Sequence, residues 1–390
     1  MNLKQLKIIH PRAVVNFWNH VTRISTTPFY KYFVYVPAYL RGGKGKCPPP
    51  SVVLLSINSV CNMRCMMCDV GRKIDKETTF YKNSIPEGAP QISLEKMKDI
   101  IDQLAPFRPF LAINSLEPFL YNDLFKAVEY AVENGLEVQI TTNGALLYKR
   151  AYEAVDSGVH RLMVSLDGPP ETHDAIRGMP GLFDKIVGGM RKIQEIKKER
   201  GLKYPLFQLS VTVSNHNQSN LSEMIDHLEG MEIHYILIAH LNYIDKPMME
   251  RHNAVTSPDY HVSPSNFTEE YKDVSPGNLK IQMDELKRKA KLRNIKIFFQ
   301  PELDEKGLNI FYHKPSVFIE RTQCFVPWTA CQIRSDGKII PSTRCFPYIL
   351  GDLYEQSFRE IWTGERAQKF RELMRKKGVL PACARCCNIF

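Results

Sequence analysis

The chain has 390 residues, of which 44% are hydrophobic and 24% are charged, and its formal net charge is +10. These proportions are ordinary for a soluble globular protein, and the length suggests one large domain with a smaller one, or two domains. No apolar run is long enough to cross a bilayer, which excludes a membrane-spanning helix, and no secretory signal is recognisable. We therefore expect a cytoplasmic protein.

Most of the net charge lies in an N-terminal arm. Residues 1–46 contain eight Lys or Arg side chains and no Asp or Glu, so they carry +8 of the +10, and eight aromatic residues lie among them. This composition is typical of a segment that lies on an anionic surface, which predicts a peripheral membrane contact. The alternative is an extension that packs its aromatic side chains on the main domain. Nucleic acid would also attract the arm, but it is not the partner we expect.

From Val52 onward the sequence alternates between apolar runs and helical patterns. Repeated βα units predict a parallel sheet with helices on its outer face. Six units over about 190 residues are too few for an eight-fold barrel, so we expect an α/β partial barrel that is open on one side. The turns after the strands should lie on one rim, where such folds place their chemistry. The predicted strands cover 52–57, 110–114, 136–144, 160–168, 206–215 and 233–242, and the helices 93–104, 121–135, 147–157, 182–200 and 219–229.

The last third of the chain is less regular. Residues 243–278 are polar, rich in Pro and Ser and without a clear period, which predicts a long loop. A helix over 279–293 and a strand over 295–299 follow, and "RSDGKII" (334–340) predicts a hairpin turn. We therefore predict three regions: the arm (1–50), a core (51–300) and a Cys-rich tail (318–390).

The ten cysteines are grouped, and only Cys47 stands alone without an expected role. Without a secretory signal, such groups favour metal binding over a disulfide framework. Cys61, Cys65 and Cys68 follow the first strand directly. Three thiolates cannot complete a tetrahedral structural zinc site, but they can hold three irons of a [4Fe–4S] cluster and leave the fourth iron open. An open position is typical of a catalytic site.

The spacing Cys-x3-Cys-x2-Cys resembles the signature of the radical S-adenosylmethionine (SAM) superfamily. The resemblance implies a partial (βα)6 barrel in which the open iron binds the amino and carboxylate groups of SAM. One electron from the reduced cluster then cleaves SAM, and the resulting 5′-deoxyadenosyl radical abstracts a hydrogen atom. It also implies an external electron donor such as a flavodoxin or a ferredoxin.

Motifs at later strand ends are similar to those of the same superfamily: "INSLEP" (113–118), "TTNG" (141–144), "SLDG" (165–168) and "DAIRG" (174–178). The resemblance implies that Glu117 contacts the ammonium group of SAM, that Arg177 pairs with its carboxylate, and that Ser165 and Asp167 face the ribose. The implied SAM-binding residues are Glu117, Asn143, Ser165, Asp167, Arg177 and Asn215.

Two features depart from the superfamily pattern. Ser115 and Leu116 replace the two glycines that usually precede the Glu-Pro pair, and Met67 stands where an aromatic residue is common. Each motif alone also has an ordinary structural interpretation. The Asn-Gly and Asp-Gly pairs can be simple turns, Arg177 a surface charge, and Glu117 a helix-start residue.

The tail resembles the SPASM/twitch extension of this superfamily, which binds auxiliary iron–sulfur clusters. Ser342 stands where the usual motif has a cysteine, and Cys345 follows three residues later. Six cysteines are too few for two auxiliary [4Fe–4S] clusters, so we expect one. Its predicted ligands are Cys324, Cys345, Cys383 and Cys386, and Cys331 and Cys387 are alternative ligands. A zinc knuckle with four thiolates is the alternative.

The expected function is radical SAM chemistry on an unactivated carbon of a small-molecule, sugar or lipid-linked substrate, with oxidation or C–C bond formation as the outcome. A peptide-maturing enzyme is the alternative within the superfamily. Two other classes stay open: a zinc-stabilised module that binds membrane or nucleic acid, and an iron–sulfur electron carrier. No general base is predicted. His240 and Tyr243, after the sixth strand, either reach the substrate or belong to the core.

Overall fold

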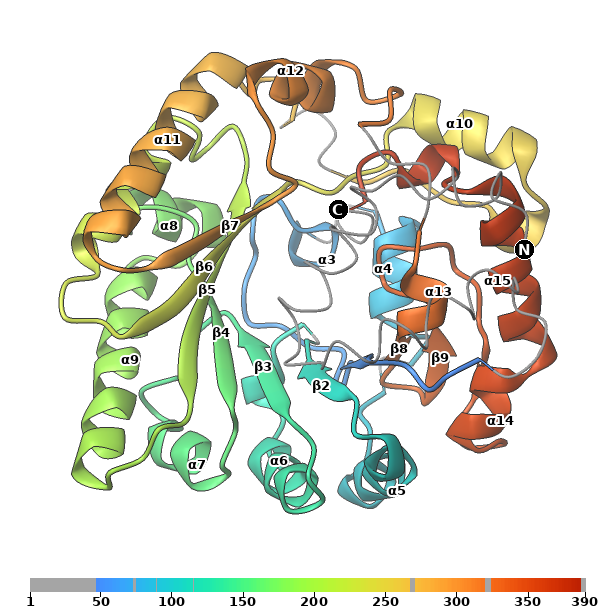
Figure 1. The fold of residues 1–390 in the computed structure, drawn as a ribbon, viewed down its shortest axis with the longest axis horizontal. Coiled ribbons are helices and arrows are strands. Elements are labelled where there is room, and N and C mark those ends of the chain that lie inside the picture. The colour runs from blue at the N-terminus through green and yellow to red at the C-terminus, as the bar shows by residue number, and fades with distance from the viewer. Residues whose placement is uncertain are drawn as a thin grey trace, which may run out of the picture.

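The computed structural model describes residues 47–72, 75–88, 90–114, 116–266, 271–319 and 324–386. Within this part of the chain, ten strands form one sheet in the order β10-β9-β8-β1-β2-β3-β4-β5-β6-β7. Figure 1 shows α5, α6, α7, α9 and α11 following one another along the outside of the curved sheet, with α3 and α4 inside the curve. The N-terminal arm of residues 1–46, and with it the predicted membrane contact, lies outside the described residues.

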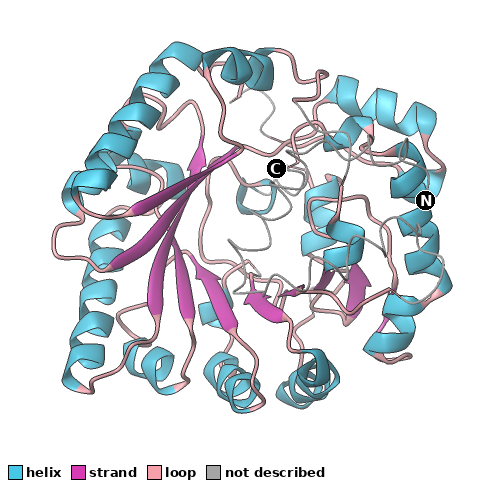
Figure 2. Ribbon diagram, viewed as in Figure 1, coloured by secondary structure: helices cyan, strands magenta, loops and turns pink. Residues whose placement is uncertain are grey.

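The six predicted strands are present, and each pairs in parallel with the next. This confirms the predicted α/β partial barrel, which Figure 2 shows as a fan of strands with helices around it. The first two strands are buried on both faces, because helices cover the outside of the sheet and other segments of the chain cover its inside. Their bounds are β1 (Val52–Leu55), β2 (Phe110–Ile113), β3 (Val138–Thr142), β4 (Arg161–Ser165), β5 (Leu206–Val213) and β6 (Ile233–His240).

The helices around the barrel follow from capping and apolar spacing. In α5 (Leu94–Leu104) the hydroxyl of Ser93 accepts a hydrogen bond from the backbone N–H of Lys96, as the predicted N-cap requires. The buried Met97, Ile100 and Leu104 then recur at helical spacing on the sheet side. The other helices of the first part are α3 (Asp69–Arg72), α4 (Thr79–Ser84), α6 (Leu124–Glu133), α7 (Ala151–Asp156), α8 (Pro170–Arg177) and α9 (Leu182–Glu199), with 3-10 turns at Ala105–Phe107 and Pro118–Leu120.

Two predictions in the middle of the chain are wrong. The helix expected over 219–229 is a 3-10 helix, Leu221–His227. The loop expected over 243–278 contains α10 (Lys246–Val255), because Asp245 caps it through the backbone N–H of Met248 and Pro247 suits the first turn. A 3-10 turn at Pro258–Tyr260 follows. The apolar spacing of α10 is too sparse to predict, since its buried residues are only Met248 and His252.

The sheet continues beyond the sixth strand. Helix α11 (Pro276–Leu292) leads into β7 (Lys296–Gln300), which pairs in parallel with β6 and forms one edge of the sheet. The helix and strand predicted over 279–293 and 295–299 are therefore confirmed. Helix α12 (Glu305–His313) follows. None of the described helices combines the length and apolarity that crossing a membrane requires.

The Cys-rich tail joins the same sheet at the opposite end. Strand β8 (Ala330–Ile333) pairs in parallel with β1, on the edge that β2 leaves free. The predicted hairpin is confirmed: β8 and β9 (Lys338–Ile340) are antiparallel, and Gly337 takes the left-handed conformation in the turn. The remaining elements are α13 (Val326–Thr329), β10 (Gly351–Asp352), α14 (Phe358–Thr363), α15 (Glu365–Lys377) and a 3-10 turn at Pro381–Cys383.

The turn after β3 supplies a stability test. Gly144 has φ +80°, and a Cβ there would lie 2.6 Å from Cγ1 of the buried Ile186. Gly181 has a similar φ of +72°, but nothing lies within 4 Å of its Cβ position. We expect Gly181→Ala to lower the free energy of unfolding by roughly 1 to 2 kcal/mol through backbone strain. Gly144→Ala should cost about 1 to 3 kcal/mol more because of overpacking. Equal unfolding midpoints of the two variants in urea would contradict the packing described here.

Candidate active site

Cys61, Cys65 and Cys68 line one cavity of about 270 Å³. Residues at the C-terminal ends of β3, β4, β5 and β6 line it as well, so the predicted rim exists. The thiol loop is fixed to α8, because the backbone N–H of Met66 donates to the carbonyl of Ile176 at 2.9 Å. It also packs tightly on itself, since a Cβ on Gly71 would lie 2.9 Å from the backbone nitrogen of Cys65.

The donor set at this cavity fits an iron–sulfur cluster. Burial raises the pKa of Cys61 to about 11, and it also raises the pKa of Cys65, although the positive charge of Arg177 opposes the latter shift. Metal binding therefore has to displace protons from both thiols. Among the described residues, no three His, Cys, Asp or Glu side chains converge as they would on a single metal ion. Thiolates are the ligands that iron–sulfur clusters use.

Arg177 reaches the cavity from the end of α8. Its Nη1 lies 3.7 Å from Sγ of Cys65, and its Nε donates to Oδ2 of Asp167 at 2.6 Å. Burial would lower the pKa of the guanidinium, but the charges of Asp167 and Cys65 outweigh that effect and raise it. Arg177 is therefore a buried, permanently charged group beside the thiols, as its predicted role requires.

Both carboxylate oxygens of Asp167 are bonded to protein groups. Its side chain is fully buried and is not among the residues that line the cavity. One carboxylate oxygen accepts from Arg177 and the other from the backbone N–H of Thr212, at 2.8 Å. Asp167 therefore orients Arg177 and ties β4 to β5, while its predicted contact with a ribose stays a prediction.

Glu117 likewise is not among the residues that line the cavity. The side chain is fully buried, and burial raises the pKa of its carboxyl group despite three hydrogen bonds. Oε1 accepts from the backbone N–H of Phe119 at 3.0 Å and from the hydroxyl of Thr142 at 2.7 Å, and Oε2 accepts from the backbone N–H of Asn143 at 2.7 Å. Glu117 thus holds the end of β3 in place, and its contact with the ammonium group of SAM stays a prediction.

Two of the remaining predicted SAM contacts face the cavity. Asn143 and Ser165 line it, and the amide Nδ2 of Asn143 donates to Oδ1 of Asn62 in the thiol loop at 2.8 Å. Asn215 is not among the lining residues. Its Oδ1 is buried and accepts no hydrogen bond from the described part of the chain. These three assignments also stay predictions.

His240 and Tyr243 have different surroundings in the structure. His240 lines the cavity, its Nδ1 lies 2.7 Å from the hydroxyl of Tyr312, and burial lowers its pKa to about 4, so the ring is neutral near pH 7. Tyr243 belongs to the core. It stacks on Tyr271 with the ring centroids 3.7 Å apart and donates its hydroxyl hydrogen to the carbonyl of Phe311 at 3.2 Å.

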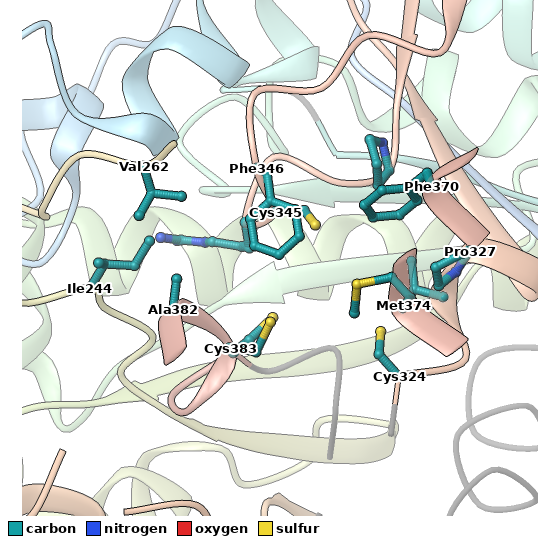
Figure 3. Close-up of a pocket in the computed structure, with 14 residues that line it drawn as sticks. Ile244, Val262, Cys324, Pro327, Cys345, Phe346, Phe370, Met374, Ala382 and Cys383 are labelled. Atoms are coloured by element: carbon teal, nitrogen blue, oxygen red, sulfur yellow. The ribbon is translucent and has the colours of Figure 1, made fainter. Parts of the chain in front are cut away.

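The four predicted auxiliary ligands line a second cavity: Cys324, Cys345, Cys383 and Cys386. Figure 3 shows three of these sulfurs around the same space, with Ile244 and Val262 on one side and Phe370 and Met374 on the other. Burial raises the pKa of Cys383 to about 12 and that of Cys345 well above its usual range, and the charges of neighbouring cysteines add to both shifts. The donor set fits one cluster with four thiolate ligands.

Cys331 does not line this cavity. It is fully buried in β8, and burial raises the pKa of its thiol to about 12. Cys387 lies outside the described residues. The carbonyl of Ser342 accepts from the backbone N–H of Cys345 at 3.0 Å, and its hydroxyl accepts from the backbone N–H of Arg344 at 3.3 Å. The thiol at this cavity therefore comes from Cys345, three residues after the position at which the usual motif has its cysteine.

Sequence reasoning missed one charged residue of the site. Arg344 lines both cysteine cavities, and its guanidinium carbon lies 3.6 Å from the centroid of the Phe80 ring. The only signal was its place directly before Cys345, and a basic residue next to a thiol is too common a pattern to single out.

Comparison with known sequences agrees with this geometry. Residues 55–228 match the family described as the radical SAM superfamily, and residues 324–387 match SPASM, described as an iron–sulfur cluster-binding domain. The chain belongs to the radical SAM superfamily. Within it, this is an enzyme with a C-terminal SPASM domain, whose cofactors are a [4Fe–4S] cluster, SAM and an auxiliary cluster, as predicted.

Several relatives of known activity are similar to the chain. An AdoMet-dependent heme synthase of Methanosarcina barkeri is 28% identical over 86% of this chain and 88% of the relative. An Fe-coproporphyrin III synthase of the same organism is 32% identical over 52% of this chain and 46% of the relative. The mycofactocin maturase MftC of Mycolicibacterium smegmatis is 26% identical over 45% and 40%.

The solved structures support the fold. Streptococcus suis SuiB bound to SAM superposes with a TM-score of 0.59 over 88% of this chain and 72% of that one, at 12% sequence identity. At this identity the likeness concerns the fold alone.

The buried pair of Arg177 and Asp167 allows a second test of stability. Arg177→Met leaves a fully buried carboxylate without its cation, which should cost about 3 to 5 kcal/mol of unfolding free energy. Adding Asp167→Asn should recover much of this loss, because the amide oxygen still accepts from Thr212. Arg200→Met, which breaks a surface pair with Asp156, is the control and should cost less than about 1 kcal/mol. A loss at Arg177 no larger than at Arg200 in urea denaturation would contradict the buried pair.

The two tail cysteines Cys345 and Cys331 make a matched pair for metal analysis. We expect about eight irons per wild-type chain after anaerobic reconstitution, about four in Cys345→Ala, and about eight in Cys331→Ala. The measurement is iron, sulfide and zinc content by chemical assay. Stoichiometric zinc in place of iron in the tail, or loss of iron in Cys331→Ala alone, would refute this ligand set.

Proposed function

We propose that this protein is a radical SAM enzyme that abstracts hydrogen from a side chain of a carboxylate-bearing tetrapyrrole. The observation that carries the proposal is the similarity to a heme synthase along 86% of the chain. Relatives named as an Fe-coproporphyrin III synthase and a pre-heme d1 synthase support the same substrate class. Hemes and coproporphyrins carry propionate side chains, so their enzymes have to bind carboxylates.

The charges at the cavity agree with an anionic substrate. Arg177 and Arg344 both line it, whereas none of the described lining residues is Asp or Glu. Because Asp167 compensates the charge of Arg177, the excess positive charge lies at Arg344. Because the three thiolates belong to the cluster, Arg344 is the cation that is left to attract an anionic substrate.

We assign the catalytic cluster to Cys61, Cys65 and Cys68, and the auxiliary cluster to the four cysteines of the second cavity. When bound, the reduced catalytic cluster supplies the electron that cleaves SAM and so generates the hydrogen-abstracting radical. The chain positions and shields that chemistry. Arg177 holds an anionic group beside Cys65, and Asn143 and Ser165 offer hydrogen bonds from two neighbouring strand ends. Asp167 and Glu117 fix these groups from behind.

The polar groups of the cavity suit a reaction without proton transfer by the protein. Burial lowers the pKa of His240 to about 4, so its ring is a weak proton acceptor near pH 7, and its Nδ1 is engaged with Tyr312. This weak basicity agrees with hydrogen-atom abstraction. An auxiliary cluster held by Cys324, Cys345, Cys383 and Cys386 would supply an acceptor for the remaining electron of an oxidation.

Peptide maturation is the second candidate. It is favoured by the similarity to the maturase MftC and by the shared fold with SuiB, one structure of which is bound to a precursor peptide. The sugar or lipid-linked substrate expected from the sequence finds no support among these relatives. That expectation was based on the N-terminal arm, which lies outside the described residues.

The test uses the full chain reconstituted anaerobically, with dithionite, SAM and iron coproporphyrin III. We expect the porphyrin to stimulate release of 5′-deoxyadenosine and to change in mass, and deuterium in its side chains to appear in that product. Cys65→Ala should release none, because the cluster loses a ligand. Release in the wild type that a peptide stimulates and the porphyrin leaves unchanged would contradict the proposal.

A further inference from the structure

We propose that Arg344 binds a carboxylate of the substrate and so holds the substrate between the two iron–sulfur sites. This inference rests on the proposed function and adds a recognition residue to it. It starts from position: Arg344 lines the cavity of Cys61, Cys65 and Cys68, and it also lines the cavity of the four tail cysteines. No other described residue appears in the lining of both.

The backbone around Arg344 is fixed from the other half of the chain. The buried amide of Asn83, in α4, donates to the carbonyl of Thr343 at 3.2 Å and to that of Cys345 at 2.9 Å, so it clamps the residues on either side. The backbone N–H of Thr343 donates to Oε1 of Gln332 in β8 at 2.8 Å. The position of Arg344 is therefore set by α4 and β8 together.

The side chain is oriented as well. Phe80, also in α4, places its ring face 3.6 Å from the guanidinium carbon. A guanidinium that lies on an aromatic face keeps its N–H donors at its edge, where they can meet a planar acceptor. One short helix thus supplies both the clamp on the backbone and the surface beneath the charge. This is the preorganisation that a binding residue needs, because little side-chain entropy is left to lose.

The charge of Arg344 is not neutralised by an ion pair. Asp69 lies within electrostatic range, but among the described residues no carboxylate forms an ion pair with Arg344, whereas Arg177 has Asp167. No described residue that lines either cavity is Asp or Glu. A partly buried guanidinium that forms no ion pair with a described carboxylate can take an anionic ligand, and its fork matches a carboxylate in two hydrogen bonds. A propionate side chain has this geometry.

The consequence concerns where the substrate lies. A carboxylate at Arg344 holds one end of the substrate at the residue that lines both cavities. The same contact keeps the substrate near the auxiliary site. Arg344 is therefore a specificity residue for carboxylate-bearing substrates, and SAM binding does not require it.

The experiment titrates the reconstituted, SAM-loaded protein with iron coproporphyrin III and follows the porphyrin absorbance. We expect Arg344→Gln to raise the dissociation constant about 10- to 100-fold, the effect of losing a charged hydrogen-bond partner. Arg344→Lys keeps the charge but loses the fork, so its effect should be smaller. Arg359→Gln removes an exposed charge from the same tail and should bind like the wild type. The affinity for SAM and the iron content should be unchanged in all of them.

The outcomes separate the two proposals. Wild-type protein that binds no iron coproporphyrin III refutes the proposed substrate class, and this inference falls with it. Porphyrin binding within twofold of wild type in Arg344→Gln refutes the role of Arg344 alone, and so does a loss of SAM affinity in place of porphyrin affinity. If Arg344→Gln loses the auxiliary cluster, Phe80→Leu carries the same test, because it changes only the surface beneath the guanidinium and should weaken porphyrin binding about 3- to 10-fold.

Discussion

The parallel pairing of β1 on both of its edges is the constraint on which the site depends. Leu55 pairs with Ile113 of β2 on one side and with Ile333 of β8 on the other. Because the three strands are parallel, the loops that follow them start at the same edge of the sheet. The amide of Gln332 donates to the hydroxyl of Ser56 at 2.8 Å and reinforces this junction. The thiol loop and the Cys-rich tail are neighbours for this reason, although more than 250 residues separate them.

A second feature is a layer of buried acids behind the cavity. Asp167 and Glu117 are both fully buried, and each binds groups that come from neighbouring strands. Their hydrogen bonds fix Arg177 and the end of β3, which carry the polar surface of the cavity. A buried carboxylate is costly unless it is fully bonded, so these acids also make the arrangement rigid. Apart from the three cluster cysteines, the charged side chains among the described lining residues are Arg177, which is paired with Asp167, and Arg344.

Sequence alone was sufficient to predict those parts of the fold and of the site that depend on local patterns. The alternation of β1 to β6 with helices follows from periodicity, and the turn at Gly337 follows from turn chemistry. The grouping of Cys324, Cys345, Cys383 and Cys386 was implied by the resemblance of the tail to the SPASM/twitch extension. The parts it missed depend on tertiary contacts. Nothing in the sequence indicates that β8 pairs with β1, that Asp167 binds Arg177 and Thr212, or that Arg344 lines both cavities. Helix α10 was missed because its capping signal at Asp245 lies in a segment with few apolar residues.

The central claim is that the cluster at Cys61, Cys65 and Cys68 keeps one iron without a protein ligand. Electron–nuclear double resonance on the reduced, SAM-bound protein tests it most directly, with ¹⁵N in the amino group of SAM. The account predicts a ¹⁵N coupling to the cluster spin, which disappears when unlabelled SAM is used. A reduced cluster that shows no such coupling while SAM is demonstrably bound would mean that the fourth iron is already occupied, and the enzymatic interpretation would be wrong.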